Sequence, residues 1–305
     1  KPEVLITIDR PDFCLSVAHR ARKRLPTLRT AHYVAPSVWA WRPGRAKKMA
    51  RVVDHVLVLL PFEPPLMKAA GMTSDFVGHP IAVVETPDRA QKLAFRAKAG
   101  LAPAEPLIAV LPGSRRGEVA RIGPVFRKTL DLLHRQFRDL RPVLPMVGAR
   151  AEAVRALFHD APGRPVFLDP SEYSRAEKLA AFAASDVAIA ASGSVSLELA
   201  AAGTPMIVAY QTNWLTALIV RQMVRVETAT LVNLVTGKRA VPEYFQGACR
   251  PGPIAAEVKR YLLDGDLAEA QAALSAEAMR RLGRGGEDPG RRAARSVLSF
   301  LEGAG

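Results

Sequence analysis

The sequence predicts an α/β protein with two Rossmann-like domains, each built on a parallel β-sheet. Short runs rich in Val, Ile, Leu and Ala alternate with segments of helical length, which is typical of successive βαβ units. A length of 305 residues exceeds what one hydrophobic core normally organises, so two domains are expected. A proline-containing stretch at residues 80–88 marks the boundary. We therefore divide the chain into residues 1–84 and 85–305.

The strands of both domains follow from apolar, β-branched runs that end in polar or glycine-containing turns. A helix is expected at residues 89–99, and from about residue 251 onward the pattern is helical. The strands expected in the first domain are residues 4–8, 30–34, 55–60 and 75–77, and those in the second are 107–111, 142–147, 166–168, 187–191 and 206–210.

The composition is typical of a folded globular protein, and the net charge favours an anionic partner. Apolar residues make up 49% and charged residues 24%, which excludes a disordered or collagen-like chain. The 43 Lys and Arg against 29 Asp and Glu give a net charge of +14, which favours nucleic acid, a membrane surface or a phosphorylated substrate. There is no zinc-finger spacing, helix-turn-helix pattern or aromatic RNP-type strand, so we do not expect nucleic acid.

The cysteines and the hydropathy of the sequence indicate the cellular compartment of the protein. Cys14 and Cys249 lie far apart and form no disulfide framework, which favours a reducing cytoplasm. No apolar run approaches the roughly 18 to 20 residues that cross a bilayer. The sequence opens on Lys1 and enters a buried-strand pattern at once, without Met or a signal-peptide layout. We expect that the true N-terminus lies upstream of this residue.

The positive charge is concentrated between residues 10 and 51. This segment holds eleven Lys and Arg against a single acidic residue, and two tryptophans accompany them. Indoles beside cations suit a lipid headgroup region or a glycolipid, whereas the alternative is a solvated helix face with two core tryptophans. The residues assigned to an acceptor-facing or membrane-facing surface are Trp39, Trp41, Arg42, Arg45, Lys47 and Lys48.

Asp9 follows the first predicted strand, at the edge of the sheet where ligands of such folds bind. A carboxylate there can act as a general base that removes a proton from a hydroxyl. The alternative is a turn carboxylate that caps the next helix, a role that Asp12 suits better. The residues alone do not decide between the two.

The strand at 107–111 ends in a tight loop before a helix. Gly113 permits an unusual backbone turn, Ser114 offers a hydroxyl, and Arg115 supplies a planar fork that matches phosphate oxygens. The loop lacks the Lys-Ser/Thr pair of a Walker motif and the spacing of a dinucleotide fingerprint. We interpret it as a phosphate contact and not as an ATP-hydrolysis loop.

The strand at 187–191 leads through small residues into a helix. Backbone N–H groups of Ser192, Gly193 and Ser194 at the helix start suit a diphosphate. Glu198 lies one turn later, where its carboxylate can reach the hydroxyls of a ribose. The alternative is a capping box with Ser194 as the N-cap, and both can hold together.

Other catalytic classes lack their signatures. The six histidines are scattered, without HxxxH or HExxH spacing, so no metal cofactor is expected. A Ser-His-Asp hydrolase is unsupported because no GxSxG sequence is present.

Taken together, the motifs resemble those of lipid-A-disaccharide synthases, glycosyltransferases of family 19 with the GT-B fold. The resemblance runs in the family's order from residue 4 to about residue 250. It rests on residues 8–13, 32–42, 60–63, 76–80, 111–115, 191–198 and 233–234.

The resemblance implies an inverting glycosyltransferase with a cleft between its two domains. The donor would be UDP-2,3-diacylglucosamine, and the 6-hydroxyl of 2,3-diacylglucosamine 1-phosphate would attack its anomeric carbon and release UDP. Residues 1–84 would then be the remainder of the acceptor and membrane-facing domain, whose leading part would lie upstream, and residues 85–305 would form the UDP-sugar domain with the C-terminal helices. No cofactor would be required. The enzyme would be cytoplasmic and peripheral on the anionic inner face of the inner membrane, and a homodimer is compatible with the sequence.

The resemblance also implies roles for single residues. Asp9 would be the catalytic carboxylate, and Arg115 would be the essential cation at the diphosphate. Asn233 and Gln246 would line the cleft. UDP-sugar binding would fall to Gly113, Ser114, Arg115, Ser192, Gly193, Ser194, Glu198, Asn233 and Gln246.

The sequence departs from the family pattern at two places, and two alternatives remain. Residues 81–84 carry no Asp after Gly78-His79-Pro80, and Val232 replaces a common Pro. One alternative is another GT-B enzyme that uses a UDP-sugar, such as a peptidoglycan-type N-acetylglucosaminyl transferase or a UDP-sugar epimerase. The other is a non-catalytic protein that binds a nucleotide or lipid headgroup.

Overall fold

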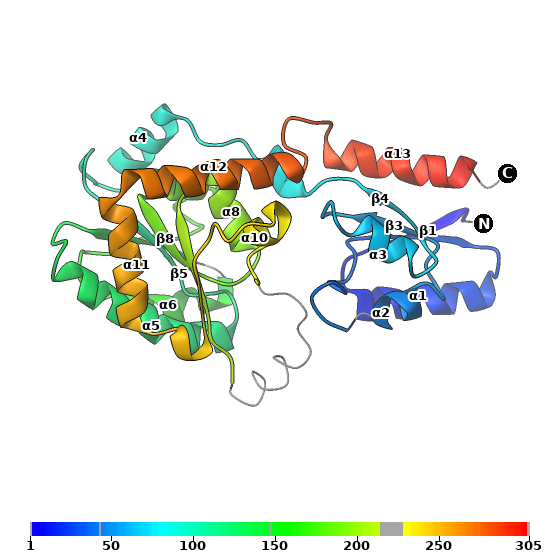
Figure 1. Ribbon diagram of the computed structural model, residues 1–305, viewed down its shortest axis with the longest axis horizontal. Coiled ribbons are helices and arrows are strands. Elements are labelled where there is room, and N and C mark those ends of the chain that lie inside the picture. Colours follow the sequence, from blue (N-terminus) through cyan, green and yellow to red (C-terminus); the bar gives the residue numbers. More distant parts are fainter. Residues whose placement is uncertain (1, 43, 147, 214–227, 304–305) are drawn as a thin grey trace. The chain divides into compact units, whose positions relative to one another are not determined.

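The computed structural model describes residues 2–42, 44–146, 148–213 and 228–303, and the contacts between residues divide the chain into two compact units (Figure 1). Unit 1 comprises the described residues 2–84 and 279–303. Unit 2 comprises the described residues 85–213 and 228–278. The described part of unit 1 is therefore assembled from two segments that are far apart in the sequence.

Unit 1 contains a four-stranded parallel sheet in the order β1-β2-β3-β4. All residues of β3 are buried, as expected for a parallel strand that is covered on both faces. The strands are β1 (Val4–Ile8), β2 (Arg29–Tyr33), β3 (His55–Val58) and β4 (Thr73–Phe76).

Helices cover both faces of this sheet. Alternate residues of β3 point to opposite faces, so Val56 and Val58 join a core with residues of α2 and α3, whereas Leu57 packs toward α13 (Figure 1). The helices of unit 1 are α1 (Pro11–Arg24), α2 (Gly44–Met49), α3 (Pro64–Lys68), the 3₁₀ helix η1 (Pro80–Val83) and α13 (Pro289–Glu302).

Unit 2 contains a six-stranded parallel sheet in the order β10-β9-β8-β5-β6-β7. The chain adds strands on one side of β5 and then returns to its other side, so β5 and β8 flank the topological switch point. Ligands of open α/β sheets bind outside the carboxyl ends of the strands at such a point. The strands are β5 (Leu107–Leu111), β6 (Arg141–Pro145), β7 (Val166–Leu168), β8 (Val187–Ala191), β9 (Met206–Tyr210) and β10 (Glu243–Phe245).

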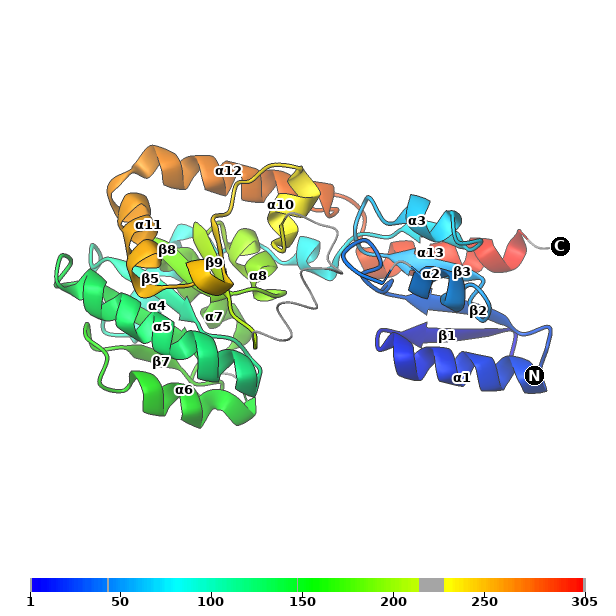
Figure 2. The same cartoon turned by 60° about the horizontal axis from the view of Figure 1, so that its bottom comes forward.

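The helices of unit 2 enclose the sheet, and its main core lies between the sheet, α5 and α11 (Figure 2). Phe126 of α5 and Ile254 of α11 are fully buried there. The helices are α4 (Arg89–Lys98), α5 (Arg116–His134), η2 (Gly148–Arg150), α6 (Ala151–Phe158), α7 (Arg175–Ala184), α8 (Val195–Ala202), α10 (Leu231–Thr236), η3 (Gln246–Ala248), α11 (Pro251–Leu263) and α12 (Gly265–Arg281), whose last three residues belong to unit 1.

The α/β class and the parallel sheets predicted from the sequence are confirmed. Each of the nine predicted strands is present, and the predicted helix at 89–99 is α4. The strand β10, of three half-buried residues at the edge of the sheet, was not predicted from the sequence. Its sequence, Glu-Tyr-Phe, is too short to show a strand period.

The predicted extent of the second domain, residues 85–305, is corrected at its C-terminal end. Residues 279–303 pack with unit 1, because Val297 of α13 is buried beside Ala31 and Leu57. The guanidinium of Arg292 donates to the carbonyl oxygen of Phe76 at 2.6 Å. An amphipathic helix fits any apolar face, so the sequence pattern did not show which sheet α13 would cover.

Candidate active site

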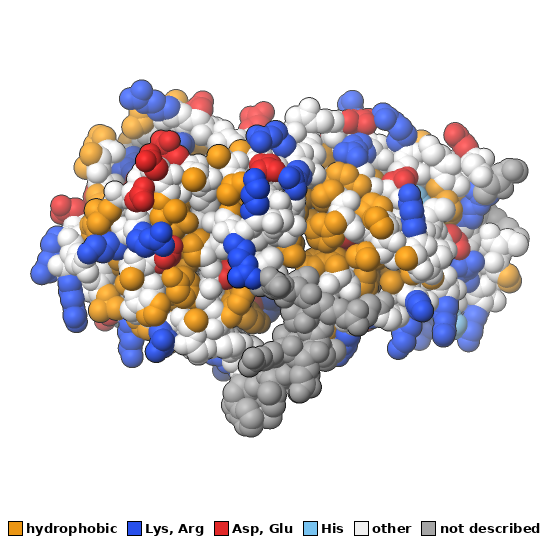
Figure 3. Space-filling model, in the orientation of Figure 1, with side chains coloured by type: hydrophobic (Ala, Val, Ile, Leu, Met, Phe, Trp, Pro, Cys, Tyr) orange, Lys and Arg blue, Asp and Glu red, His pale blue; other side chains and the backbone are white. Residues whose placement is uncertain are grey.

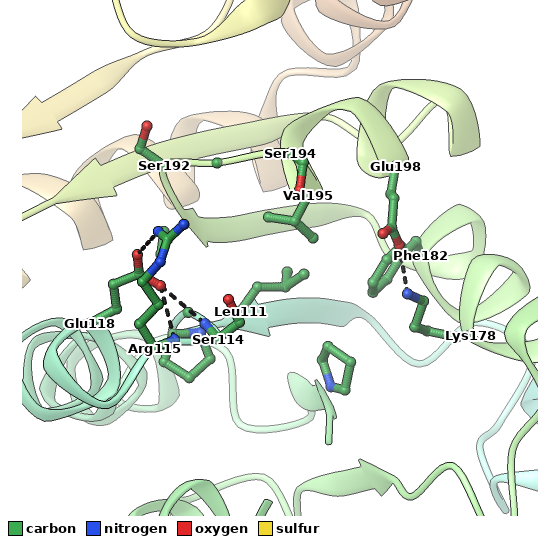
Figure 4. A pocket seen from close by; sticks show the side chains of 15 residues that line it. Leu111, Ser114, Arg115, Glu118, Lys178, Phe182, Ser192, Ser194, Val195 and Glu198 are labelled. Atoms are coloured by element: carbon green, nitrogen blue, oxygen red, sulfur yellow. Dashed lines mark hydrogen bonds and ion pairs between the residues drawn. The ribbon is translucent and has the colours of Figure 1, made fainter. Parts of the chain in front are cut away.

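A pocket of about 270 Å³ opens at the switch point of unit 2 (Figure 4). The loop after β5 and the loop after β8 form opposite walls, which brings together the two motifs singled out in the sequence. We call it the switch-point pocket. Its lining consists of Leu111, Pro112, Gly113, Ser114, Arg115, Glu118, Pro145, Lys178, Phe182, Ala191, Ser192, Gly193, Ser194, Val195 and Glu198.

The loop after β5 is closed by the carboxylate of Glu118. Its Oε2 accepts from the backbone N–H groups of Ser114 at 3.1 Å and Arg115 at 3.2 Å, and its Oε1 accepts from the Arg115 guanidinium at 2.6 Å. Glu118 is nearly buried, whereas 79% of the Arg115 side chain is exposed. A carboxylate of the chain thus occupies the backbone N–H groups of this loop, while the Arg115 guanidinium, which the sequence predicts as a phosphate contact, stays accessible.

Gly113 makes this arrangement sterically feasible. Its φ of 110° lies in the region that side chains rarely adopt, and a Cβ there would stand 2.5 Å from the Glu118 Cβ. The sequence prediction of an unusual turn at Gly113 is confirmed, and Glu118 is the reason that the turn needs glycine.

The loop after β8 presents the start of α8 to the pocket. The first amides of a helix have no intrahelical acceptor and carry the positive end of its dipole. Ser194 occupies the N-cap position, yet its side chain makes no capping hydrogen bond. The capping-box alternative is therefore wrong here. A Cβ added at Gly193 would meet open space, so a ligand can approach this backbone.

Glu198 points into the same pocket from α8, where it pairs with a residue that the sequence analysis missed. Its Oε2 lies 2.6 Å from Nζ of Lys178 on α7 (Figure 4). The apolar ring of Phe182, one turn further along α7, completes this wall. Lys178 stands twenty residues before Glu198, so no local motif could predict this ion pair. In contrast, the position of Glu118 in the first turn of a helix is a local signal for its hydrogen bonds to the backbone N–H groups of the preceding loop.

Asn233 and Gln246 do not line this pocket. The Asn233 side chain is buried and exchanges hydrogen bonds with the backbone of Val241, donating at 3.0 Å and accepting at 2.8 Å. Gln246 follows β10, and its side-chain oxygen accepts from the backbone N–H of Thr212 at 3.4 Å. Asn233 thus holds α10 to the segment before β10, and Gln246 lies at the carboxyl edge of the sheet.

Asp9 lies in unit 1, directly after β1. Asp9 and Arg10 have φ values of 52° and 41°, which turn the chain sharply out of the strand, and the Asp9 N–H donates to Tyr33 at 2.9 Å. The Asp9 side chain is exposed. The helix-cap alternative for Asp9 finds no support, because the N-cap of α1 is Arg10 and no side chain caps it.

His32 is a buried neighbour of Asp9. Its Nδ1 lies 2.8 Å from the Thr7 hydroxyl, and its Nε2 has no hydrogen-bond partner among the described residues. Burial lowers the pKa of His32, and the charge of Asp9 acts in the opposite direction. Burial thus favours the neutral imidazole of His32.

The tryptophans of the basic segment differ in their surroundings. Trp39 is half-buried, its ring meets Phe62 edge-on at 5.5 Å, and its Nε1 donates to the buried carboxylate of Glu63 at 3.0 Å. Trp41 is exposed, and the Arg42 guanidinium lies 4.5 Å from its ring centroid. The core alternative thus describes Trp39 better than Trp41.

Basic side chains line the edge of unit 1 that carries α1 and α2 (Figure 3). Lys47 and Lys48 are exposed on α2, and Arg45 bonds to Asp12 of α1. Within the described ranges, no helix is long and apolar enough to cross a bilayer, and no group of three His, Cys, Asp or Glu side chains is arranged to hold a metal ion.

Comparison with known proteins decides the family. A family model described as LpxB, lipid-A-disaccharide synthetase, matches residues 1–295. The lipid-A-disaccharide synthase of Ruegeria pomeroyi is 52% identical over 99% of this chain and 75% of its own length. That of Rhodospirillum centenum is 41% identical over 98% of this chain and 74% of its own length. The chain belongs to the lipid-A-disaccharide synthase family.

Membership confirms the predicted glycosyltransferase of lipid A disaccharide synthesis. Solved structures confirm the fold: an S. aureus MnaA–UDP structure matches with a TM-score of 0.66 at 11% identity, covering 99% of this chain and 75% of that one. The UDP-GlcNAc 2-epimerase of Neisseria meningitidis bound to UDP-GlcNAc matches with a TM-score of 0.62 at 12% identity, covering 99% and 76%. These likenesses place both units within the GT-B class of folds.

Proposed function

We propose that this glycosyltransferase takes UDP-2,3-diacylglucosamine as donor and 2,3-diacylglucosamine 1-phosphate as acceptor. The acceptor's 6-hydroxyl oxygen forms a bond to the anomeric carbon of the donor, and the bond from that carbon to the UDP oxygen breaks. The hydroxyl proton passes to a base, and UDP leaves with the bonding electrons. A single displacement of this kind inverts the anomeric centre and gives a β-1,6-linked disaccharide 1-phosphate.

The observation that carries this proposal is the convergence of two anion-binding loops on the switch-point pocket. The exposed Arg115 guanidinium and the first amides of α8 can stabilise the negative charge that develops on UDP as it leaves. Glu198 stands one turn into α8, where a carboxylate suits the paired hydroxyls of a ribose. In this role Lys178 fixes the Glu198 carboxylate in one orientation.

On the acceptor side, Asp9 is the base in this proposal. Its carboxylate is exposed at the carboxyl edge of the first sheet, where a sugar hydroxyl can reach it. A positioned general base accelerates such a step by roughly 10²- to 10⁴-fold. The roles given to Asp9, to Arg115 and to the first amides of α8 do not call on a metal ion, so we expect turnover with a metal chelator present.

The acyl chains of both substrates favour an enzyme that works at the inner-membrane surface. The basic segment between residues 10 and 51 and the exposed Trp41 support attachment to anionic lipid without insertion across the bilayer. Attachment of this kind weakens with ionic strength. Flotation with phosphatidylglycerol vesicles, repeated at rising salt, measures it against zwitterionic vesicles as the control.

Mass spectrometry of the reaction tests the substrates directly. The protein is incubated with both substrates in neutral detergent micelles containing EDTA. Equal amounts of UDP and of a tetraacyl disaccharide monophosphate are the expected products. UDP binding without any disaccharide would contradict the proposed acceptor and favour a protein that only binds nucleotide.

Two variants test the residue roles. Asp9→Asn should lower kcat by about 10²- to 10⁴-fold and leave UDP affinity unchanged, because only the base is lost. Arg115→Ala should weaken UDP binding by about 10- to 100-fold, whereas Arg116→Ala removes the same charge outside the pocket and serves as the control. A comparable loss of UDP affinity in Asp9→Asn, or native affinity in Arg115→Ala, would contradict the assignment concerned.

A further inference from the structure

A second polar pocket lies within unit 1, between α1 and α2. Its volume is about 520 Å³. We call it the α1–α2 pocket. Its lining consists of Asp12, Leu15, Pro36, Arg42, Gly44, Arg45 and Lys48.

Three cations and one carboxylate set the charge of this pocket. The Arg45 guanidinium bonds to the Asp12 carboxylate, which ties α2 to the first turn of α1. Within the described part of the chain, neither Arg42 nor Lys48 lies within ion-pair distance of an acidic side chain. The pocket therefore retains two positive charges. A phosphate monoester carries about −1.5 to −2 at neutral pH, which matches this excess.

Arg42 is held in place by the backbone and by an aromatic ring. Its φ of 51° lies in the left-handed region, which non-glycine residues rarely adopt and which functional sites often retain. The guanidinium stacks on Trp41 at 4.5 Å, and the Arg42 carbonyl accepts from the Arg45 N–H at 3.0 Å. A guanidinium fixed in this way is prepared for a bidentate bond to phosphate oxygens.

The pocket lies at the same edge of the sheet as Asp9. Asp12 follows β1 by four residues, and Pro36 follows β2 by three, so both belong to the carboxyl edge of the parallel sheet. Asp9 stands between β1 and Asp12 at that edge. One ligand with a phosphate and a hydroxyl can thus meet the pocket and the Asp9 carboxylate within a single unit.

We propose that the α1–α2 pocket binds the phosphate of the acceptor, with Arg42 and Lys48 as its specific cations. The inference rests on the proposed function, which supplies an acceptor whose anomeric phosphate distinguishes it from the UDP-linked donor. Leu15 and Pro36 form an apolar wall beside the cations. Held there by its phosphate, the acceptor presents its sugar ring to the edge that carries Asp9.

Steady-state kinetics in neutral detergent micelles test the pocket. Lys48→Met and Arg42→Gln should each raise the KM for the acceptor by about tenfold or more, with the KM for the donor unchanged, because each removes one charge-assisted bond to phosphate. Lys23→Met, an exposed lysine of α1 that does not line the pocket, removes the same charge from the same unit and is the matched control. Equal effects of Lys48→Met and Lys23→Met would overturn the proposal.

A lipid headgroup carries the same phosphate chemistry, so flotation with phosphatidylglycerol vesicles forms a second arm. If the pocket serves the acceptor, Lys48→Met and Lys23→Met reduce vesicle binding equally, since each removes one charge from the surface. A selective loss of vesicle binding in Lys48→Met, with an unchanged acceptor KM, would assign the pocket to lipid and overturn the proposal.

Direct binding separates failure of the pocket from failure of the proposed function. Glucosamine 1-phosphate, which lacks acyl chains and uridine, is titrated into the protein and followed by ³¹P NMR. The native protein should broaden its phosphate resonance, and Lys48→Met should abolish most of that broadening. Binding without any transferase activity would leave the pocket standing and overturn the acceptor role, whereas activity without Lys48-dependent binding would overturn the pocket.

Discussion

Gly113 is the residue on which the shape of the Arg115 loop depends. A Cβ at this position would meet Glu118 at 2.5 Å while the backbone holds a φ of 110°, so Gly113→Ala must displace the loop or the carboxylate. We expect a stability loss of about 1 to 3 kcal/mol and a UDP affinity that falls about tenfold. Thermal unfolding and calorimetric titration with UDP measure the two effects.

Gly100 offers a matched control for this substitution. It also has a positive φ, of 65°, but a Cβ there would meet nothing within 4 Å. Gly100→Ala should therefore cost only the backbone strain, of about 1 to 2 kcal/mol, and leave UDP binding unchanged. Native UDP affinity in Gly113→Ala would show that the loop geometry does not matter to the nucleotide.

Glu63 is a buried carboxyl group whose pKa differs strongly between the folded and the unfolded state. Burial raises its pKa from 4.5 to about 7, against the lowering effect of hydrogen bonds from the Leu60 backbone and the Trp39 indole. Between these pH values the folded protein holds a proton that the unfolded chain has released. The folded state therefore loses stability as pH rises from about 4.5 to about 7, by at most about 3 kcal/mol.

Glu63→Gln removes this titration, so the native protein should lose stability relative to the variant between pH 5 and pH 8. A glutamine side chain at this position can still accept from the Trp39 indole, but it does not replace both the bond from the indole and the bond from the Leu60 N–H. The lost bond changes the stability of the variant by an amount that does not vary with pH. His32, His55 and His79, whose pKa values burial lowers, oppose the trend equally in both proteins and cancel in the difference. Parallel stability curves for the two proteins would contradict the assignment.

At the scale of elements, α13 is held on the first sheet by a partly buried polar network of Ser296, His55 and Asp75. Ser296 of α13 donates to Asp75 at 2.6 Å and lies 2.8 Å from Nε2 of His55. Because the single hydroxyl proton of Ser296 goes to Asp75, its oxygen accepts from the imidazole. The ring of Phe300 stacks on His55 with centroids 4.9 Å apart. The network is thus both polar and aromatic.

His55→Ala should destabilise unit 1 by about 2 to 4 kcal/mol. The substitution removes the imidazole N–H that donates to the Ser296 hydroxyl oxygen, and it opens a cavity under Phe300. Hydrogen exchange should show faster opening of α13 than of α5. The exposed residue His19 of α1 provides the control, since His19→Ala removes no buried contact. Unchanged protection of α13 in His55→Ala would mean that the network does not fasten the helix.

Strands and helices with a clear hydrophobic pattern could be predicted from the sequence. The position of a helix that packs on a distant part of the chain could not. The strands around the switch point are continuous apolar runs, so their bounds were readable within one or two residues. The site loops were readable because each follows such a strand. In contrast, α13 is amphipathic, and its contacts in the structure, such as those of Val297 and Ser296 with the first sheet, reveal which unit it completes.

At the scale of the whole molecule, the sequence predicted which loops would meet but not which side chains would join them. Gly113 and Ser194 belong to local motifs, and parallel topology brings both to one edge. Lys178 with Glu198 and Glu63 with Trp39 pair across twenty or more residues, without a local pattern. That Asn233 lines the cleft stays a prediction; in unit 2 its buried amide exchanges hydrogen bonds with the Val241 backbone, as a buried amide must satisfy its hydrogen-bonding groups.

Each unit has its own hydrophobic core, so we expect the molecule to unfold in two transitions. UDP binds unit 2 in our proposal. At a hundred times its Kd it should stabilise that unit by about 2.7 kcal/mol and raise its transition by roughly 5 to 10 °C. His55→Ala should lower only the transition of unit 1, since its network lies wholly there.

Differential scanning calorimetry of the native protein and of His55→Ala, each with and without UDP, separates the two effects. The four scans should show one transition that responds only to UDP and one that responds only to the substitution. A single transition moved by both would mean that the two units unfold as one cooperative body. In that case a variant of unit 1 would also weaken UDP binding near its melting temperature, because the folded pocket would depend on the stability of both units.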